Sequence, residues 1–269
     1  MKISFMTFMT PEWTLDEVIA GARRHGYDGV EPRVTANHKH GIEPDAPAAA
    51  RKEARQRFAD AGVEIACIAT SCTFAASDPA KRQANMDNLK RHIELAADVG
   101  APGIRVFGGV RPEGMSIEDA IAIVAEDLVR GCELAGDTGV GVWLETHDHF
   151  SRAEYAAAVV GNTECVCVAI NWDLMHPFRN GETTDQTWAF LRQGKLVRHT
   201  HLHDGIEEGG KLRLVPIGEG RIPFHAPLRL LRDAGYTGYL SAEYWAELGE
   251  PDEGLSRYIT AVRRVLSEI

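Results

Sequence analysis

The sequence has little basic charge and no long apolar segment. Its 269 residues carry 29 Lys and Arg against 39 Asp and Glu, a formal net charge of −10 at pH 7. Proteins that bind a phosphate backbone depend on a basic face, so the acidic balance argues against a nucleic-acid partner. No run approaches the roughly 18 apolar residues that a membrane-spanning helix requires, so we expect no membrane partner.

Cysteines are few, and their spacing suggests no pairing. There are five, an odd number, and no two form a C-x-x-C pair. We interpret them as reduced thiols of a cytoplasmic protein, because disulfides rarely persist in the cytosol. Four of them, Cys67, Cys72, Cys165 and Cys167, are expected to be small core residues. The N-terminal segment reaches Pro11 after a short apolar stretch, which indicates a strand and not a signal peptide.

Short apolar, β-branched segments recur along the chain, with helical segments between them. They begin near Ile3, Gly29, Val63, Gly103, Val140, Val166, Val197 and Gly238. Strands that alternate with helices imply parallel strands joined by right-handed crossovers. Eight units of about 33 residues fill the chain and predict a single (β/α)8 TIM barrel over residues 1–269. An open doubly wound sheet is the alternative, but the sequence has no GxGxxG after the first strand and no Walker motif.

The ends of the predicted helices have recognisable signals. Thr14 and Glu17 form a capping-box pattern before the first helix. Gly26, Gly100 and Gly139 stand where a helix would end in a left-handed turn before the next strand.

Four consecutive predicted strands end in a carboxylate or an imidazole. These residues are Glu145, Asp173, His201 and Glu243. In a barrel of this kind the active site lies at the C-terminal ends of the strands. Neighbouring strand ends are roughly 4.8 Å apart, so the four side chains can converge on one ion. Three buried carboxylates would repel one another without a cation, so we expect one divalent metal ion, Mn, Mg or Zn. The alternative is a set of rim charges on exposed loops.

Five further polar residues, at or after the ends of predicted strands, are candidates for substrate contact. They are His147, His176, His203, Glu31 and Arg179. His147 follows Glu145 by two residues and therefore points to the same side, as His203 does after His201. Arg179 is a candidate anion hook in the loop after the sixth strand. For Glu31 the alternative is a surface ion pair, and for His203 it is plain exposure to solvent.

The motifs around the four strand ends resemble the sugar phosphate isomerase/epimerase family of the xylose isomerase-like TIM barrel superfamily. They read LETH, NWDLMHP, HTHLHDG and SAEYW, and the resemblance spans essentially the whole chain. It implies that Glu145, Asp173, His201 and Glu243 hold one divalent ion, and that His176 of the D-x-x-H motif faces the substrate. One position departs from the family, because His203 occupies the place where H-x-K-D usually has Lys.

The resemblance implies a divalent-metal-dependent isomerase or epimerase of a ketose, cyclitol or sugar phosphate. Catalysis would pass through a metal-stabilised enediolate, with Glu145 and Glu243 as acid and base. A dehydratase or lyase acting on a keto-sugar or inosose shares that intermediate and is the main alternative. An endonuclease IV-like nuclease is a remote one, because the third strand ends in Thr70-Ser71-Cys72 without a His. A non-catalytic sugar-binding barrel and a homo-oligomer are left open.

Overall fold

The structure is a computed structural model that describes residues 1–193, 196–243 and 249–269. Its main sheet is wholly parallel and has the order β3-β2-β1-β11-β8-β7-β6-β5-β4. The strands are β1 (Lys2–Met6), β2 (Gly29–Glu31), β3 (Glu64–Ile65), β4 (Ile68–Thr73), β5 (Gly103–Phe107), β6 (Gly141–Glu145), β7 (Val168–Asp173), β8 (Val197–Leu202) and β11 (Tyr239–Ala242).

The two ends of the sheet, β3 and β4, meet and close the barrel. β3 and β4 lie at opposite ends of the sheet order, yet they are consecutive along the chain. A parallel bridge joins Arg33 to Ala69, and Ala69 N donates to Pro32 O at 2.9 Å. β3 and β4 are therefore two parts of one predicted strand. Pro32 has no N–H to give to the ladder, which accounts for the gap in regular pairing. The predicted (β/α)8 TIM barrel is confirmed.

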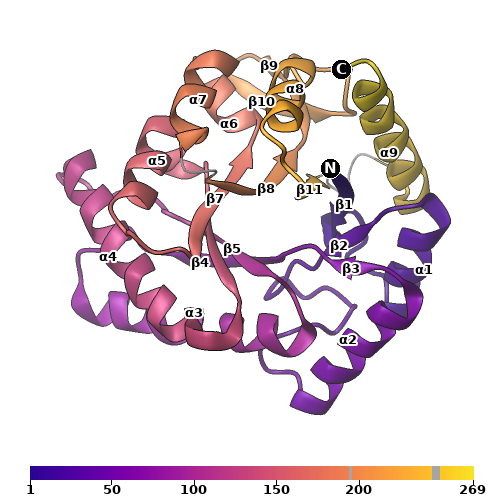
Figure 1. Ribbon diagram of the computed structural model, residues 1–269, viewed down its shortest axis with the longest axis horizontal. Coiled ribbons are helices and arrows are strands. Elements are labelled where there is room, and N and C mark those ends of the chain that lie inside the picture. The colour runs from indigo at the N-terminus through magenta and orange to yellow at the C-terminus, as the bar shows by residue number, and fades with distance from the viewer. Residues whose placement is uncertain (194–195, 244–248) are drawn as a thin grey trace.

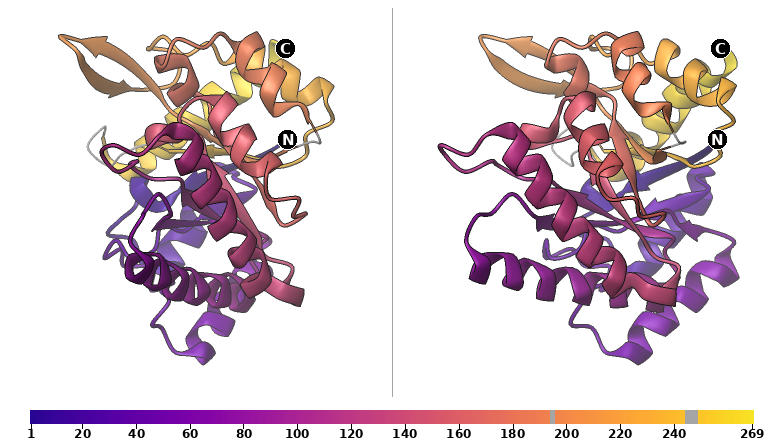
Figure 2. Two further views of the ribbon diagram at one scale, coloured as in Figure 1. Left: turned by 90° about the vertical axis from the view of Figure 1, so that its left-hand side faces the viewer. Right: turned by 60° about the vertical axis from the view of Figure 1, so that its left-hand side comes forward.

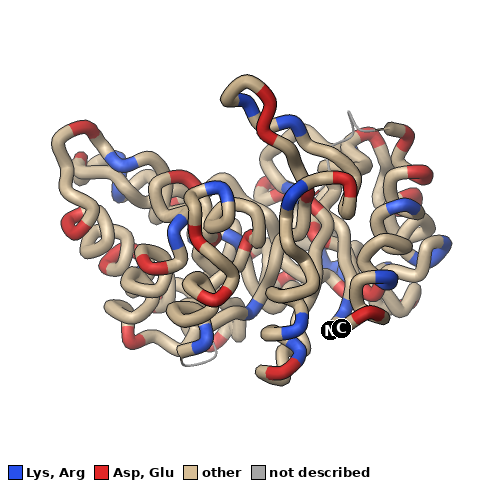
Figure 3. The backbone as a smooth tube through the Cα atoms, turned by 90° about the horizontal axis from the view of Figure 1, so that it is seen from above, with Lys and Arg blue, Asp and Glu red and all other residues tan. Residues whose placement is uncertain are grey.

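The helices surround the barrel (Figure 1). They are α1 (Leu15–His25), α2 (Ala48–Ala61), α3 (Pro79–Val99), α4 (Ile117–Ala135), α5 (Ala153–Gly161), α6 (Met175–Arg179), α7 (Thr184–Leu191), α8 (His225–Asp233) and α9 (Pro251–Ser267), with 3₁₀ turns at Thr7–Met9, Gly136–Thr138 and Asp148–Phe150. None of the helices within the described residues is both long and apolar enough to cross a bilayer. Charges of both signs are interspersed around the outside (Figure 3).

Most predicted helix ends are confirmed. Thr14 and Glu17 make the expected capping box, and Gly26 and Gly100 end α1 and α3 with φ of 76° and 77°. α4 itself stops at Ala135, before the end predicted at Gly139, and a 3₁₀ turn over Gly136–Thr138 follows it. Gly139 then makes the predicted left-handed turn, with φ of 78°.

A β-hairpin follows β8 that we did not predict. β9 (Asp204–Glu208) and β10 (Lys211–Val215) pair antiparallel and project from the barrel (Figure 2). Gly209 and Gly210 form its tip, both with positive φ. The Gly-Gly pair between two short alternating segments is a hairpin signal that could have been recognised.

The expectation of reduced thiols is wrong for one pair of cysteines. Cys132 of α4 and Cys167, directly before β7, form a disulfide although 35 positions separate them in the sequence. Packing of α4 against β7 brings the two together, which no local spacing indicates. Cys67, Cys72 and Cys165 are free, and the first two are buried. The cytoplasmic localisation stays a prediction.

A buried histidine makes the barrel sensitive to acid. His40 is 3% exposed, its Nε2 lies 3.1 Å from Arg33 O, and Ile42 N donates to its Nδ1 at 3.0 Å. Burial lowers the pKa of His40 to about 4. Since the unfolded chain keeps the ordinary, higher pKa, it binds the proton first as the pH falls. The neutral, buried His40 therefore contributes its full stabilisation above about pH 6.5. This contribution is lost as the pH falls from about 6.5 to about 4.

We expect His40→Gln to reduce the loss of stability between pH 7 and pH 4.5 by about 2 kcal/mol, measured by urea unfolding. The control is His225→Gln, which removes an exposed imidazole beside Glu268. Equal acid sensitivity of the wild type and the His40 variant would contradict this explanation.

Candidate metal centre

The structure brings the four predicted metal ligands together at one end of the barrel. Glu145 ends β6, Asp173 ends β7, His201 lies in β8, and Glu243 directly follows β11. One ligand atom of each lies within 4.8 Å of those of the others. The first three are fully buried and Glu243 is 9% exposed, so they are not rim charges. Parallel register supplies this convergence, since Asp173 pairs with His201, and Glu243 N donates to Leu202 O at 3.2 Å.

The chemistry of this cluster suits a divalent cation. Among the described residues, Glu145 Oε2, Asp173 Oδ2 and Glu243 Oε2 are buried and make no hydrogen bond. His201 Nδ1 lies 3.1 Å from Glu145 Oε1 and 3.2 Å from Glu243 Oε2. Nitrogens of one arginine and two histidines lie within 3.2 Å of these oxygens, but three buried carboxylates beside one another are still costly unless a further cation compensates them. Three oxygen donors and one imidazole nitrogen therefore fit Mn²⁺, Mg²⁺ or Zn²⁺.

The electrostatics of the four candidate ligands also favour a bound cation. Burial by itself would raise the pKa of Asp173, but the imidazoles of His203 and His176 outweigh it and hold the pKa well below its ordinary value. Burial likewise opposes ionisation of Glu243, yet His201 brings its pKa down to about 2. Burial disfavours a charged His201, but Glu31, Glu145 and Glu243 raise its pKa well above the ordinary value. The site thus keeps Asp173 and Glu243 ionised and attracts positive charge.

Glu31 adjoins the cluster and contacts two histidines of β8. It is fully buried at the end of β2. Its Oε1 is 3.0 Å from His201 Nε2, its Oε2 is 2.7 Å from His199 Nε2, and Ser241 Oγ donates to Oε2 at 2.6 Å. The contact between Glu31 and a sugar stays a prediction, and both carboxylate oxygens already have partners within the barrel. A carboxylate on the far nitrogen of a ligating histidine fixes the orientation of the ring.

Two further buried residues adjoin the cluster, and neither was among the predicted site residues. Arg105 Nε lies 3.2 Å from Glu145 Oε2, an ion pair without hydrogen-bond alignment, and its guanidinium stacks over the Phe107 ring at 4.1 Å. Asn171 Nδ2 is 3.1 Å from both ring nitrogens of His201. Strand alternation was the available signal, because each lies two residues before the end of a strand.

Asp173 is anchored through one oxygen and leaves the other free of hydrogen bonds. Its Oδ1 accepts from Met175 N at 2.8 Å and from His176 N at 3.1 Å, at the start of α6. Thr146 Oγ1 accepts from Asp173 N at 3.0 Å. These contacts aim Oδ2 at the cluster.

Three predicted substrate-contact histidines form a row beside the metal cluster. Ring centroids are 4.5 Å apart for His147 and His176, and 5.7 Å apart for His176 and His203. His203 Nε2 lies 2.7 Å from Asp173 Oδ2, so the residue at the usual Lys position contacts a candidate ligand. Burial disfavours the charged form of His147, but Asp148 raises its pKa to about 8. The row offers nitrogen donors and acceptors to a molecule bound at the cluster.

Arg179 is placed differently from the other candidates. Its Nε pairs with Glu207 Oε1 of β9 at 3.1 Å, and it lines a cavity beside α6 with Leu212 and Arg221. Within the part of the chain that the structure describes, Arg179 forms no ion pair or hydrogen bond with the four candidate metal ligands. Tyr244 and Trp245 of the SAEYW motif lie outside the described residues.

Comparison with known proteins gives the family. A family model described as xylose isomerase-like TIM barrel matches residues 19–264. Fructoselysine 3-epimerase of Shigella flexneri is 23% identical over 259 residues, covering 90% of this chain and 90% of the relative. The solved structure of IOLI protein with a binding zinc atom has a TM-score of 0.85 at 20% identity and covers 100% of this chain and 99% of its own. The probable 3-DHS dehydratase AsbF from Bacillus anthracis has a TM-score of 0.79 at 18% identity, covering 98% and 99%. At these identities the solved structures show the fold alone. The resemblance noted in the sequence is confirmed: this chain belongs to the xylose isomerase-like TIM barrel family.

Proposed function

We propose that this protein is a divalent-metal-dependent sugar isomerase or epimerase that acts on a ketose, a cyclitol or a sugar phosphate. The observation that carries the proposal is that Glu145 and Glu243 present oxygens to the same imidazole nitrogen, with a third carboxylate beside them. The fructoselysine 3-epimerase relative supports the class of reaction. The zinc atom in the IOLI structure supports the use of a metal.

Glu145, Asp173, His201 and Glu243 would hold the ion. When bound, the ion would supply Lewis-acid stabilisation of negative charge on the oxygens of a keto-sugar. Glu31 and Asn171 keep the His201 ring oriented from behind, and Arg105 restrains Glu145. The ligand set is therefore held in place before any sugar arrives.

Glu145 and Glu243 would perform the proton transfers. They come from β6 and from the end of β11, so they approach the centre of the cluster from different sides. The low pKa of Glu243 leaves it ionised at neutral pH, as a base must be. One carboxylate would remove the proton from the carbon next to the carbonyl. Return of a proton to the opposite face of that carbon gives the epimer, and return to its neighbour gives the isomer.

The row of histidines would bind the hydroxyls of the sugar. We expect His176→Ala to raise KM by on the order of tenfold with little change in kcat, because the ring binds substrate and does not move the proton. Steady-state kinetics on the metal-loaded protein would measure both constants. The control is His225→Ala on the surface. A drop in kcat at unchanged KM would instead place His176 in the chemical step.

A dehydratase is the second candidate function, because AsbF, which has the same fold, is a probable 3-DHS dehydratase. The two reactions share the first proton removal and differ in the second step. A dehydratase expels a β-hydroxyl, so its product has lost one water, whereas an epimer or isomer keeps the mass of the substrate. Mass spectrometry of the product therefore separates the two functions.

The proposal is tested by incubating the metal-loaded protein with ketoses, ketose phosphates and inososes in deuterated water. We expect at least one substrate to acquire deuterium on the carbon beside its carbonyl, detected by NMR. Absence of both exchange and conversion across the whole panel, with each divalent metal, would contradict the proposal.

A further inference from the structure

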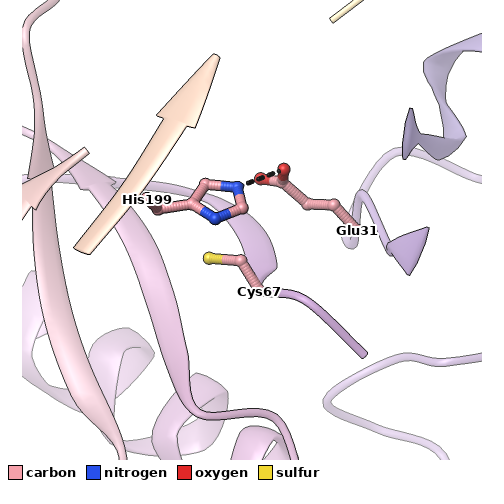
Figure 4. A group of neighbouring side chains, drawn as sticks. All are labelled: Glu31, Cys67 and His199. Carbon is pink, nitrogen blue, oxygen red and sulfur yellow. Dashed lines mark hydrogen bonds and ion pairs between the residues drawn. The ribbon is translucent and has the colours of Figure 1, made fainter. Parts of the chain in front are cut away.

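We propose that the barrel contains a second metal site, formed by Glu31, Cys67 and His199, which takes a thiophilic divalent ion of the zinc class. Glu31 ends β2, Cys67 lies between β3 and β4, and His199 lies in β8. One ligand atom of each lies within 4.8 Å of those of the other two, and all three residues are fully buried. Figure 4 shows Cys67 and Glu31 approaching the imidazole from different sides.

The proposed mechanism gives no role to the His199 imidazole or to the Cys67 thiol. His199 Nδ1 is buried and makes no hydrogen bond among the described residues. The Cys67 thiol has a weak contact with Ile68 O at 3.7 Å. A buried cysteine is usually a small core residue. Here, however, a carboxylate oxygen and an imidazole nitrogen lie within 4.8 Å of the same sulfur. Sulfur, nitrogen and oxygen donors together favour zinc over magnesium or calcium.

Cys72 provides an internal comparison. It is also buried, and its Sγ lies 3.7 Å from His92 Nδ1. Within the described residues no carboxylate joins that pair to make a metal-capable group, whereas Glu31 completes the group at Cys67. The second site is therefore defined by the three-residue group and not by a cysteine beside a histidine.

Glu31 links the two sites. Its Oε1 meets His201 Nε2, and its Oε2 meets His199 Nε2 and Ser241 Oγ. An ion in the second site would take the place of the hydrogen bond between Glu31 Oε2 and His199 Nε2, and Glu31 would then contact both sites. The second site adjoins the first metal centre but does not depend on the proposed reaction.

The test uses Co²⁺ as a spectroscopic probe and Zn²⁺ for stoichiometry. Thiolate coordination to Co²⁺ gives a near-ultraviolet charge-transfer band that oxygen and nitrogen ligands do not. We expect the band in the wild type, its loss in Cys67→Ser, and its retention in the matched control Cys72→Ser. Elemental analysis after dialysis should give about two zinc ions per chain for the wild type and about one for Cys67→Ser. Asp173→Asn, which damages the first site, should keep the band.

Thermal melts would establish that each variant is folded, and His199→Gln provides a second variant if Cys67→Ser does not fold. Absence of the band in wild-type protein saturated with Co²⁺ would overturn the proposal. Persistence of the band in Cys67→Ser would overturn it as well. Loss of the second zinc in His203→Gln but not in Cys67→Ser would assign that ion to the neighbouring group of Asp173, His176 and His203 and would also overturn it.

Discussion

Glu243→Gln is expected to lower kcat by a factor on the order of 10² or more, the usual effect of losing a positioned general base. The amide has the same shape as the carboxylate and carries no charge. Because Glu243 is 9% exposed, the substitution buries no additional charge, and the barrel should fold normally. The amide oxygen can still act as a ligand, so metal binding should weaken but persist. Glu145→Gln should have a loss of similar size, because the two carboxylates share the proton transfers.

The measurement is the initial rate on the substrate identified by deuterium exchange, at saturating metal. Glu133→Gln, on the exposed face of α4, is the matched control and should retain full activity. Circular dichroism would verify the fold of each variant. Full activity of both the Glu145 and Glu243 variants would refute their assignment, because no other pair of carboxylates within the described residues meets at His201 Nδ1.

Asp173→Asn is expected to weaken binding of the first metal by on the order of 10²-fold or more. Changes in the partners that merely orient a ligand already cost about 10- to 100-fold, so loss of a charged ligand should cost at least as much. Asn is preferable to Ala because its carbonyl oxygen can still accept from Met175 N and His176 N at the start of α6. The charge is removed while this local anchor is kept.

Titration with Mn²⁺ would give the affinity of the wild type and of the Asp173 variant. A second readout is thermal stability, because an ion that binds only the folded state raises the melting temperature. Mn²⁺ should stabilise the wild type and have little effect on the variant. Unchanged Mn²⁺ affinity in Asp173→Asn would remove this residue from the metal centre.

The barrel and the four ligand candidates were predictable because both depend on local order. Each predicted strand carries its own apolar pattern, and parallel neighbours bring their C-terminal residues to one rim. Glu145, Asp173, His201 and Glu243 therefore meet without any knowledge of side-chain conformations. The capping box at Thr14 and Glu17 is local in the same sense.

Features that depend on packing between distant segments were not predictable in this way. The Cys132–Cys167 disulfide requires the particular docking of α4 on β7. Glu31 was expected at the sugar, and the contacts of both its oxygens with the histidines of β8 were not predicted. Arg179 is drawn to Glu207 by a hairpin that was itself missed. In each case a contact between distant segments decided the placement.

The position of a bound ion tests the central claim most directly. Anomalous diffraction from a crystal soaked in Mn²⁺ should show a peak within about 2.2 Å of His201 Nδ1 and of one oxygen each of Glu145, Asp173 and Glu243. His201 Nε2 should remain paired with Glu31, as it is now at 3.0 Å. A crystal that shows no manganese at saturating concentration, or manganese elsewhere while His201 Nδ1 still contacts Glu145 and Glu243, would contradict the proposed metal centre.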